Sequence, residues 1–267
     1  MVRVTTTNRR EVLRAGAGLV AGGALAAGCA GAPAGPSTTA SADPSARASG
    51  HPAATTSRTA PAPRPYPGQP AQITHGPRNR PRVALTFHGQ GDPQLAASLL
   101  GAAERRGARL TVLAVGTWLD EHPDLARRIL DGGHDLGNHT QRHVAVNAMS
   151  PAAARKEITD CADRLQRLTG SIGTWFRPSR SPTASPEVAA LARAAGYPHV
   201  LSYDVDSLDY TRPGADAITR KVAAEVRPGS VVSLHFGYPG TVTALPAVLH
   251  ELDRRGLRAV TTTELLS

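Results

Sequence analysis

The sequence predicts an α/β fold in which parallel strands alternate with helices and form a sheet or barrel. From Arg82 onward, short apolar runs alternate with longer amphipathic stretches. Alternation of this kind over about 185 residues is typical of parallel strands joined by helical crossovers. Polar side chains follow most of the apolar runs, and in such folds function gathers at the carboxyl ends of strands.

The apolar runs place seven strands, at Val83–Phe87, Leu110–Val115, Asp135–Asn138, Thr174–Arg177, Val200–Tyr203, Val231–His235 and Ala259–Thr261. The amphipathic stretches between them predict helices over residues 93–106, 122–131, 151–169, 185–195, 215–226 and 241–255. Ser150-Pro151 and Ser185-Pro186 stand where two of these helices are expected to begin. Serine is a preferred N-cap residue, and proline is favoured in the first turn of a helix. Gly170 follows the third helix, where a glycine is the preferred terminator.

The positive charge of the chain lies mostly outside this α/β region. Of the formal net charge of +9, residues 1–80 contribute nine arginines against two acidic residues. The remaining residues are therefore nearly neutral, and we expect no nucleic-acid partner.

Residues 1–29 resemble a bacterial export signal. A basic start is followed by an apolar run over residues 15–28, which is shorter than the ~20 residues of a membrane span. Arg9-Arg10 resembles a twin-arginine signal, and Leu25-Ala-Ala-Gly-Cys29 resembles a lipobox whose cysteine is lipidated. We expect an extracytoplasmic protein, either anchored through a lipid on Cys29 or cleaved nearby and secreted.

Residues 30–80 are rich in Ala, Pro, Ser, Thr and Gly and predict a disordered linker. The folded domain is expected over residues 81–267. The second cysteine, Cys161, lies in a helical pattern and is expected to be a small buried residue, so the chain has no disulfide framework.

Histidines and charged residues follow the third to sixth strands. His139 and His143 stand four apart after the third strand, and neutral imidazoles are favoured zinc ligands. Arg177 ends the fourth strand, the run Asp204-Val-Asp206-Ser-Leu-Asp209-Tyr210 ends the fifth, and Ser233-Leu234-His235 ends the sixth. Singly, these residues suit surface charges, turn formers or hydrogen-bonded core histidines. Their recurrence at successive strand ends indicates one shared site.

In order, these segments resemble the polysaccharide deacetylase (NodB-homology) family. The matching motifs are TF-x-x at residues 86–89, then H-[ST]-x-x-H, F-R-P, V-D-S-x-D and L-H, followed by residues 241–246. The resemblance covers residues ~80–267 and implies a distorted (β/α) barrel, a divalent metal, expected to be zinc, and a monomer. It implies hydrolysis of N- or O-acetyl groups, with carbon–nitrogen bonds outside peptides as the main target. The substrates it implies are peptidoglycan, a chitin-like polymer or acetylxylan.

The resemblance also assigns roles to the metal and acid residues. It implies that His139 and His143 bind the metal and that His235 is the general acid. An aspartate of the fourth motif, Asp209 or else Asp206, tunes that acid.

Further roles concern the base and the acetyl group. By the same resemblance, Arg177 braces the catalytic base and the backbone N–H of Arg180 helps to hold the oxyanion. Leu234 would line the acetyl pocket, and Tyr210 stands where the family often has tryptophan.

The first motif departs from the family at its two most important positions. The family has Thr-Phe-Asp-Asp-Gly, in which the first Asp is the general base and the second is the third metal ligand. Here His88 and Gly89 occupy those positions. The third motif also differs, because Ser179-Arg-Ser181 replaces the usual Pro-x-Gly.

A histidine at position 88 leaves three possibilities. His88 could be the third metal ligand, with another residue such as Asp92 as the base. It could instead be the base, kept neutral by the nearby charge of Arg177, beside a metal held by His139 and His143. In the third possibility the metal is lost, and the protein binds cell-wall carbohydrate without turnover. The complete acid side favours an active metal-dependent hydrolase.

Overall fold

The computed structural model describes residues 59–267. The expected export signal with Cys29, and the linker as far as residue 58, lie outside the described residues. Within residues 59–267, none of the helices combines the length and the apolar character needed to cross a bilayer.

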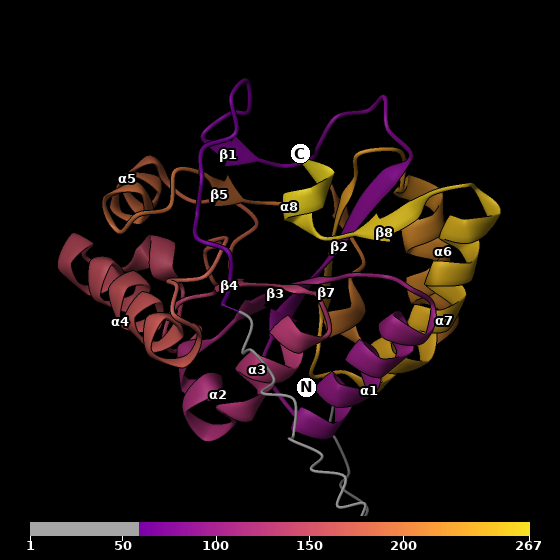
Figure 1. Ribbon diagram of the computed structural model, residues 1–267, viewed down its shortest axis with the longest axis horizontal. Coiled ribbons are helices and arrows are strands. Elements are labelled where there is room, and N and C mark those ends of the chain that lie inside the picture. Colours follow the sequence, from indigo (N-terminus) through magenta and orange to yellow (C-terminus); the bar gives the residue numbers. More distant parts are fainter. Residues whose placement is uncertain (1–58) are drawn as a thin grey trace, which may run out of the picture. The chain divides into compact units, whose positions relative to one another are not determined.

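The core of the domain is a six-stranded parallel sheet, which confirms the predicted fold class (Figure 1). Five strands follow the order β4-β3-β2-β7-β6, and the sixth, β8, also pairs with β2. Their bounds are Arg82–Gly89 (β2), Thr111–Ala114 (β3), Asp135–Asn138 (β4), Val205–Asp206 (β6), Val231–His235 (β7) and Arg258–Val260 (β8). Because every pair is parallel, the carboxyl ends of the strands lie at one end of the sheet.

A shorter parallel pair, β1 (Gln72–Ile73) and β5 (Val200–Leu201), lies beyond the β4 edge of this sheet. The strand expected at Thr174–Arg177 is reduced to Phe176, which bridges Asn138 of β4 on one side and Val200 on the other. Pro178 follows Arg177 and has no N–H to donate, which limits further pairing there. The segment 200–206 thus pairs with Phe176 at its start and with β7 at its end.

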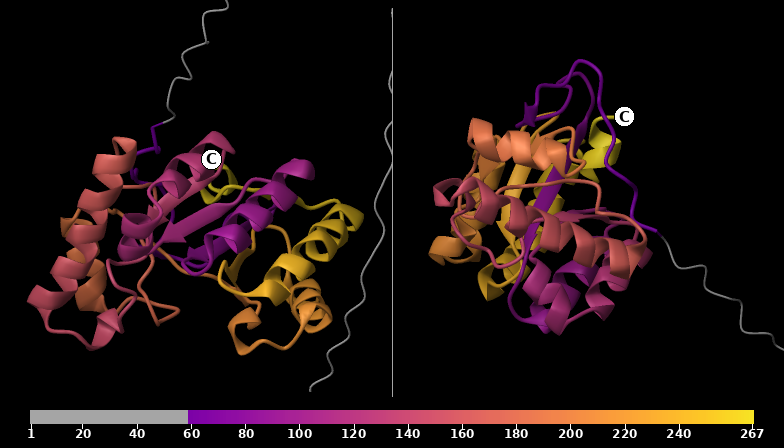
Figure 2. Two further views of the ribbon diagram at one scale, coloured as in Figure 1. Left: turned by 90° about the horizontal axis from the view of Figure 1, so that it is seen from below. Right: turned by 90° about the vertical axis from the view of Figure 1, so that its left-hand side faces the viewer.

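Helices surround the strands (Figures 1 and 2), and most of them pack against the face of the sheet that carries the main core cluster. They are Pro93–Arg105 (α1), Gly116–Glu121 (α2), Asp124–Asp131 (α3), Pro151–Thr169 (α4), Pro186–Ala194 (α5), Ala215–Glu225 (α6), Pro239–Arg254 (α7) and Thr262–Leu265 (α8). All six expected helices are present. The sequence did not predict α2 and α8, because helices of four to six residues are too short to show a period.

Helix α4 shows how the sequence sets the helix ends. The Ser150 side chain accepts a hydrogen bond from the backbone N–H of Ala153 at its start, and Gly170 ends it with φ 77°. Ser185 caps α5 in the same way, through the backbone N–H of Val188. These local signals work because each satisfies backbone groups that a helix end leaves unpaired.

Alternate side chains of β2 point to opposite faces of the sheet, one facing the main hydrophobic core and the other facing the histidines described below. Val83, Leu85 and Phe87 pack in the main core cluster with residues of α1 and α7. Ala84 belongs to a different cluster on the other face, and alternation places His88 on that face as well. The register pairs His88 with His235 of the neighbouring strand β7.

The linker expected to reach residue 80 ends earlier, because residues 59–75, hereafter the strap, pack on the domain. Tyr66 stacks on Trp175 with ring centroids 5.3 Å apart, and its backbone N–H donates to Nε2 of His199 at 2.9 Å. Ile73 is fully buried. The strap has few large apolar residues of its own. It is held on the domain by the packing of Tyr66 and Ile73 and by the pairing of β1 with β5.

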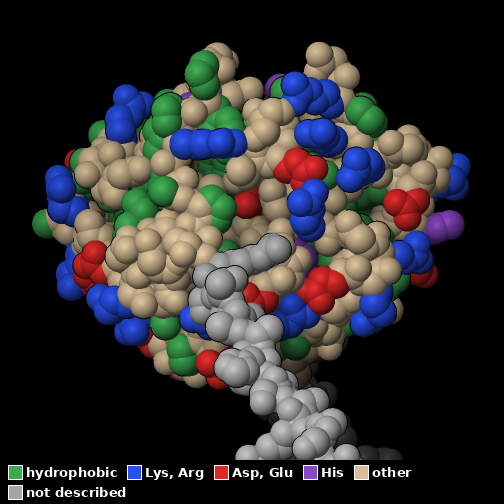
Figure 3. Space-filling model, viewed as in Figure 1, with side chains coloured by type: hydrophobic (Ala, Val, Ile, Leu, Met, Phe, Trp, Pro, Cys, Tyr) green, Lys and Arg blue, Asp and Glu red, His purple; other side chains and the backbone are tan. Residues whose placement is uncertain are grey.

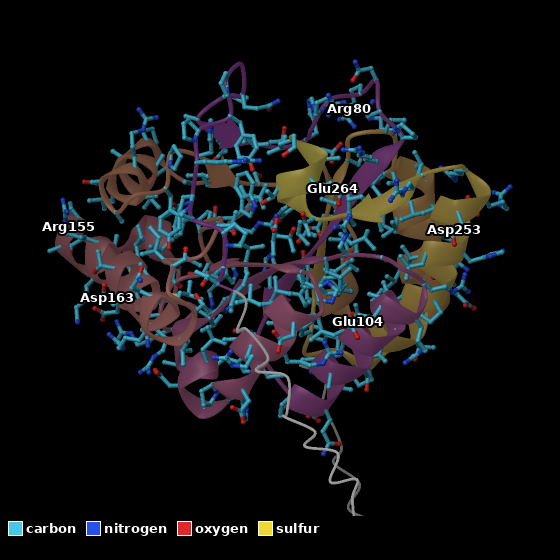
Figure 4. The ribbon with its side chains drawn as sticks, viewed as in Figure 1. Arg80, Glu104, Arg155, Asp163, Asp253 and Glu264 are labelled. Carbon is cyan, nitrogen blue, oxygen red and sulfur yellow. The ribbon has the colours of Figure 1, made fainter. Side chains whose placement is uncertain are left out.

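Charged side chains of both signs are interspersed over the face shown in Figure 3. Several form ion pairs, such as Arg128 with Glu104 at 2.5 Å and Arg109 with Glu264. The two carboxylates of these pairs, labelled in Figure 4, lie on different elements of this face. Exposed pairs of this kind contribute little to stability, about 0–1 kcal/mol each.

Candidate active site

Four histidines converge at the carboxyl ends of the central strands. The ring of His88, on β2, lies 4.4 Å from that of His139, which follows β4, and 4.3 Å from that of His235, which ends β7. The rings of His139 and His143 are 5.0 Å apart. Residues far apart in the chain thus share one site, because parallel strands bring their carboxyl ends together.

Three of these imidazoles are arranged as metal ligands. His88, His139 and His143 each offer a ring nitrogen, and these nitrogens all lie within 4.8 Å of one another. Nδ1 of His139 donates to the carbonyl oxygen of Arg177 at 3.0 Å, an interaction that often orients metal-binding histidines. Its Nε2 is buried without a hydrogen-bond partner in residues 59–267. A buried polar atom without a partner is costly, so this nitrogen fits a cation.

The electrostatics keep these three rings neutral. Burial, followed by the charges of neighbouring groups, holds the pKa of His88 and of His139 well below the usual value. Burial and the charge of Arg180 lower the pKa of His143 to about 4. Neutral imidazole is the form that binds a metal. The residues present therefore fit a divalent cation held by three histidines, a known zinc ligand set.

His235 is paired with a buried carboxylate. Nδ1 of His235 donates to Oδ1 of Asp209 at 2.6 Å. The other oxygen, Oδ2, accepts from the backbone N–H of His235 at 2.8 Å and from Oγ1 of Thr241 at 2.7 Å. Asp209 thus fixes the ring, and Nε2 is the nitrogen that remains available to a ligand in the cavity.

Asp206, the other candidate partner of His235, has different contacts. Its Oδ1 accepts from the backbone N–H of Leu208 at 3.0 Å. Of the two aspartates that the sequence left open, Asp209 is the one that contacts His235.

Arg177 is fully buried beside the site. Its Nε and Nη2 donate to the carbonyl oxygens of Leu201 and Ser202 at 3.0 and 2.9 Å. Burial lowers its pKa to about 10, so the guanidinium remains charged at neutral pH. That charge contributes to the low pKa of His88, as expected from the sequence, although burial is the larger cause.

A cavity of about 360 Å³ opens onto these groups. This volume lies within the range of small-molecule sites. Tyrosines, histidines and a single carboxylate meet there, and the lining residues are His88, Gln90, His143, Arg180, Ser181, Pro182, Tyr203, Asp206, Tyr210, Ser233, His235 and Tyr238.

Arg180 and Tyr210, two further residues that the resemblance singled out, line this cavity. Arg180 has the left-handed φ of 54°, and within residues 59–267 its backbone N–H donates to no carbonyl oxygen. The ring of Tyr210 is 5.5 Å from that of His235, and 45% of the residue is exposed.

Leu234 and Asp92 lie elsewhere. Leu234 is paired with Phe87 and packs in the main hydrophobic core, so the expectation that it lines the acetyl pocket is wrong. Alternation along β7 turns Leu234 away from the face that carries Ser233 and His235. Asp92 is the N-cap of α1 and accepts from the backbone N–H of Gln94 at 2.8 Å. It does not line the cavity.

Ser233 lines the cavity, although the sequence assigned no role to it. Its hydroxyl lies 3.3 Å from Nε2 of His88. The spacing Ser233-x-His235 was the available signal, because residues two apart in a strand point to the same face.

Gly89 has little room for the carboxylate that the family carries at this position. A Cβ atom there would lie 2.9 Å from Cγ1 of Val112 and 3.1 Å from Cα of Ala114. An aspartate at position 89 would require a shift of β3.

A parallel α/β domain with a histidine cluster and an Asp–His pair at its strand ends carries groups that can hold a cation and transfer a proton. Comparisons with known proteins show which family has this architecture. The family model for polysaccharide deacetylase matches residues 75–200. A peptidoglycan-N-acetylglucosamine deacetylase of Bacillus cereus is 31% identical over 194 residues, which cover 71% of this chain and 90% of the relative. The chain therefore belongs to the polysaccharide deacetylase family.

Other similar proteins include both enzymes and a pseudoenzyme. A chitooligosaccharide deacetylase of Bradyrhizobium is 30% identical over 197 residues, covering 65% of this chain and 85% of the relative. A CE4 family pseudoenzyme from Bacillus anthracis superposes with a TM-score of 0.70 at 25% identity, covering 74% of this chain and 70% of that one. A mutant of this pseudoenzyme with restored enzymatic activity also has a TM-score of 0.70, at 26% identity over 74% of this chain and 72% of that one.

Proposed function

We propose that this protein is a metal-dependent carbohydrate deacetylase that removes N- or O-acetyl groups from a cell-wall or environmental polysaccharide. One observation carries the proposal: the ligand nitrogens of three neutral histidines lie within 4.8 Å of one another, beside the Asp209–His235 pair. The relatives named for deacetylation of peptidoglycan and chitooligosaccharides support a glycan as the substrate.

We assign His88 as the third ligand, together with His139 and His143, and zinc as the metal. Three imidazoles are a ligand set that zinc accepts while keeping a position open for water. A divalent cation bound there would polarise the acetyl carbonyl and acidify a water molecule.

The remaining steps belong to residues on the cavity wall. His235 would donate the proton at Nε2 to the sugar nitrogen or oxygen as its bond to the acetyl carbon breaks. The free backbone N–H of Arg180 would stabilise the negative charge that develops on the carbonyl oxygen. With His88 as a ligand, the water needs another proton acceptor. We assign this role to Asp206, the one carboxylate in residues 59–267 that lines the cavity.

The sequence supports an extracytoplasmic location for this activity. The twin-arginine-like start and the lipobox-like residues before Cys29 would place the domain outside the cytoplasm, tethered by a lipid or secreted. This location suits a polysaccharide substrate.

A second candidate function is carbohydrate binding without turnover. The specific observation in its favour is the loss of both family carboxylates at His88 and Gly89, together with the similarity to a pseudoenzyme. It predicts glycan binding that survives His139→Ala and His235→Ala.

Elemental analysis of the purified chain, beside a deacetylation assay, tests the proposal. We expect stoichiometric zinc and acetate release from a chitooligosaccharide or peptidoglycan, both removed by a chelator and restored by zinc. His88→Ala should lose the zinc if His88 is a ligand. Zinc that remains in this variant while turnover disappears would make His88 the base, and equal turnover without metal would contradict the proposal.

A further inference from the structure

The loop that carries two of the three metal-binding histidines is conformationally strained. In the loop 139–144, Thr140 and His143 have positive φ angles of 66° and 55°. Non-glycine residues in this region cost on the order of 1–3 kcal/mol each and persist only where the surroundings enforce them. Something must therefore hold His143 in place.

One contact comes from the position where the third motif departs from its family. Ser179 is fully buried, and its hydroxyl donates to the carbonyl oxygen of Val144. The same hydroxyl lies 2.9 Å from Oγ1 of Thr140, which can donate to it. Proline, the usual family residue at this position, has no hydroxyl and can make neither bond.

A second contact comes from helix α4. The carboxylate of Glu157 is buried, with 3% of its side chain exposed. Its Oε2 accepts from the backbone N–H of Arg142 at 2.8 Å, and its Oε1 accepts from Nε of the same residue at 2.6 Å. A buried carboxylate without partners is costly, so Glu157 opposes any movement of the loop away from α4.

These contacts act on both sides of His143, at residues 142 and 144, whereas His139 is held separately by the carbonyl oxygen of Arg177. The three histidines that would bind the metal are not joined by a carboxylate at position 89, which would add negative charge to the ligand set. Its affinity for a cation depends on how well three neutral rings are placed.

We infer that Ser179 and Glu157 are positioning residues that hold His143 in the geometry needed to bind the metal. This inference rests on the proposed metal site and names residues that act through the loop 139–144. The serine at position 179 supplies a contact that the family proline lacks, in a chain that also lacks the family's carboxylate ligand.

The test is the zinc affinity of the full chain, measured by chelator competition, with the visible spectrum of the cobalt(II) form as a second readout. Ser179→Ala and Ser179→Pro should each raise the zinc Kd by about 10-fold or more and change the cobalt spectrum. Glu157→Ala should act likewise, and Glu157→Gln, which keeps one acceptor oxygen, should recover part of the affinity.

Two controls separate positioning from general stability. Asp163→Asn changes an exposed carboxylate on the same helix (Figure 4) and should leave the Kd unchanged. Ser185→Ala removes a helix cap elsewhere and should lower Tm without moving the Kd.

The outcomes also distinguish this inference from the proposed function. If the wild-type chain binds zinc and folded Ser179 and Glu157 variants bind it equally well, the inference is wrong and the metal site stands. If the wild-type chain binds no zinc, both are overturned.

Discussion

The two halves of the site are built on different principles. Around the proposed metal, His88, His139 and His143 are neutral rings with no carboxylate among the clustered ligand groups. Around the proposed acid, Asp209 accepts three hydrogen bonds, two of them from His235. The departures from the family pattern lie at His88 and Gly89 and in the segment Ser179-Arg-Ser181, whereas Asp209 and His235 keep that pattern. One half of such a site can change its ligands while the scaffold of the other half stays intact.

Asp209→Asn should have the largest effect on turnover while leaving the metal half unchanged. Without the carboxylate, the imidazole of His235 loses the partner that fixes its orientation and its tautomer. We expect deacetylation to fall by about 10²–10⁴-fold, with zinc content unchanged. Rates and bound zinc measured on the same sample check this.

Asp216→Asn, an exposed carboxylate on α6, is the matched control and should behave as wild type. Loss of zinc from Asp209→Asn would show that the two halves are not separable.

Asp206→Asn tests whether the carboxylate that lines the cavity replaces the missing base. We expect turnover to fall by about 10²-fold with zinc retained, because the amide cannot accept the proton from water. Added formate should restore part of the rate in Asp206→Ala by supplying a carboxylate in the vacated space. Full activity of Asp206→Asn would return the role of base to His88.

Gly89→Asp tests whether the metal half can accept the carboxylate that the family has. Its Cβ would press on Val112 and Ala114, so we expect a loss of about 1–3 kcal/mol in the free energy of unfolding. Denaturant titration measures this loss. Gly240→Ala, at a glycine without a left-handed φ and with its nearest neighbour, Cδ1 of Ile218, at 3.6 Å, is the control for a side chain added without a clash. A Gly89→Asp variant as stable as wild type would show that β3 can shift to make room for the side chain without a loss of folding free energy.

A further expected effect is on the pH dependence of stability in the metal-free protein. The pKa of His143 is lowered to about 4, and the pKa values of His88 and His139 are lowered well below the usual value. The unfolded chain protonates these rings near pH 6.5. Between those values the unfolded state binds more protons, so stability should fall as the pH drops from 7 to 5.

Thermal unfolding at the two pH values, with a chelator present, measures this change. His143→Asn removes one of the three rings and should make the dependence shallower. A Tm that is independent of pH in the wild-type protein would contradict the low pKa values.

The sequence predicted the repeated pattern better than the details of pairing. Strands such as Val231–His235 and helices such as Pro151–Thr169 were predicted because their apolar period and end signals are local. The strand expected at Thr174–Arg177 shrank to one bridge at Phe176. Its extent depended on neighbours that no local pattern describes. The composition of the strap predicts a linker, because composition alone does not show the core on which Tyr66 and Ile73 dock.

By itself, the sequence determined the order of strands and helices and placed histidines 88, 139, 143 and 235 at or just after strand ends, because hydrophobic period and capping residues act over a few neighbours. Only the tertiary structure decided that Asp209 holds His235, that Leu234 faces the helices and that Ser179 supports the loop of His143. Those outcomes depend on strand register and on contacts between distant segments, which arise only when the whole chain packs.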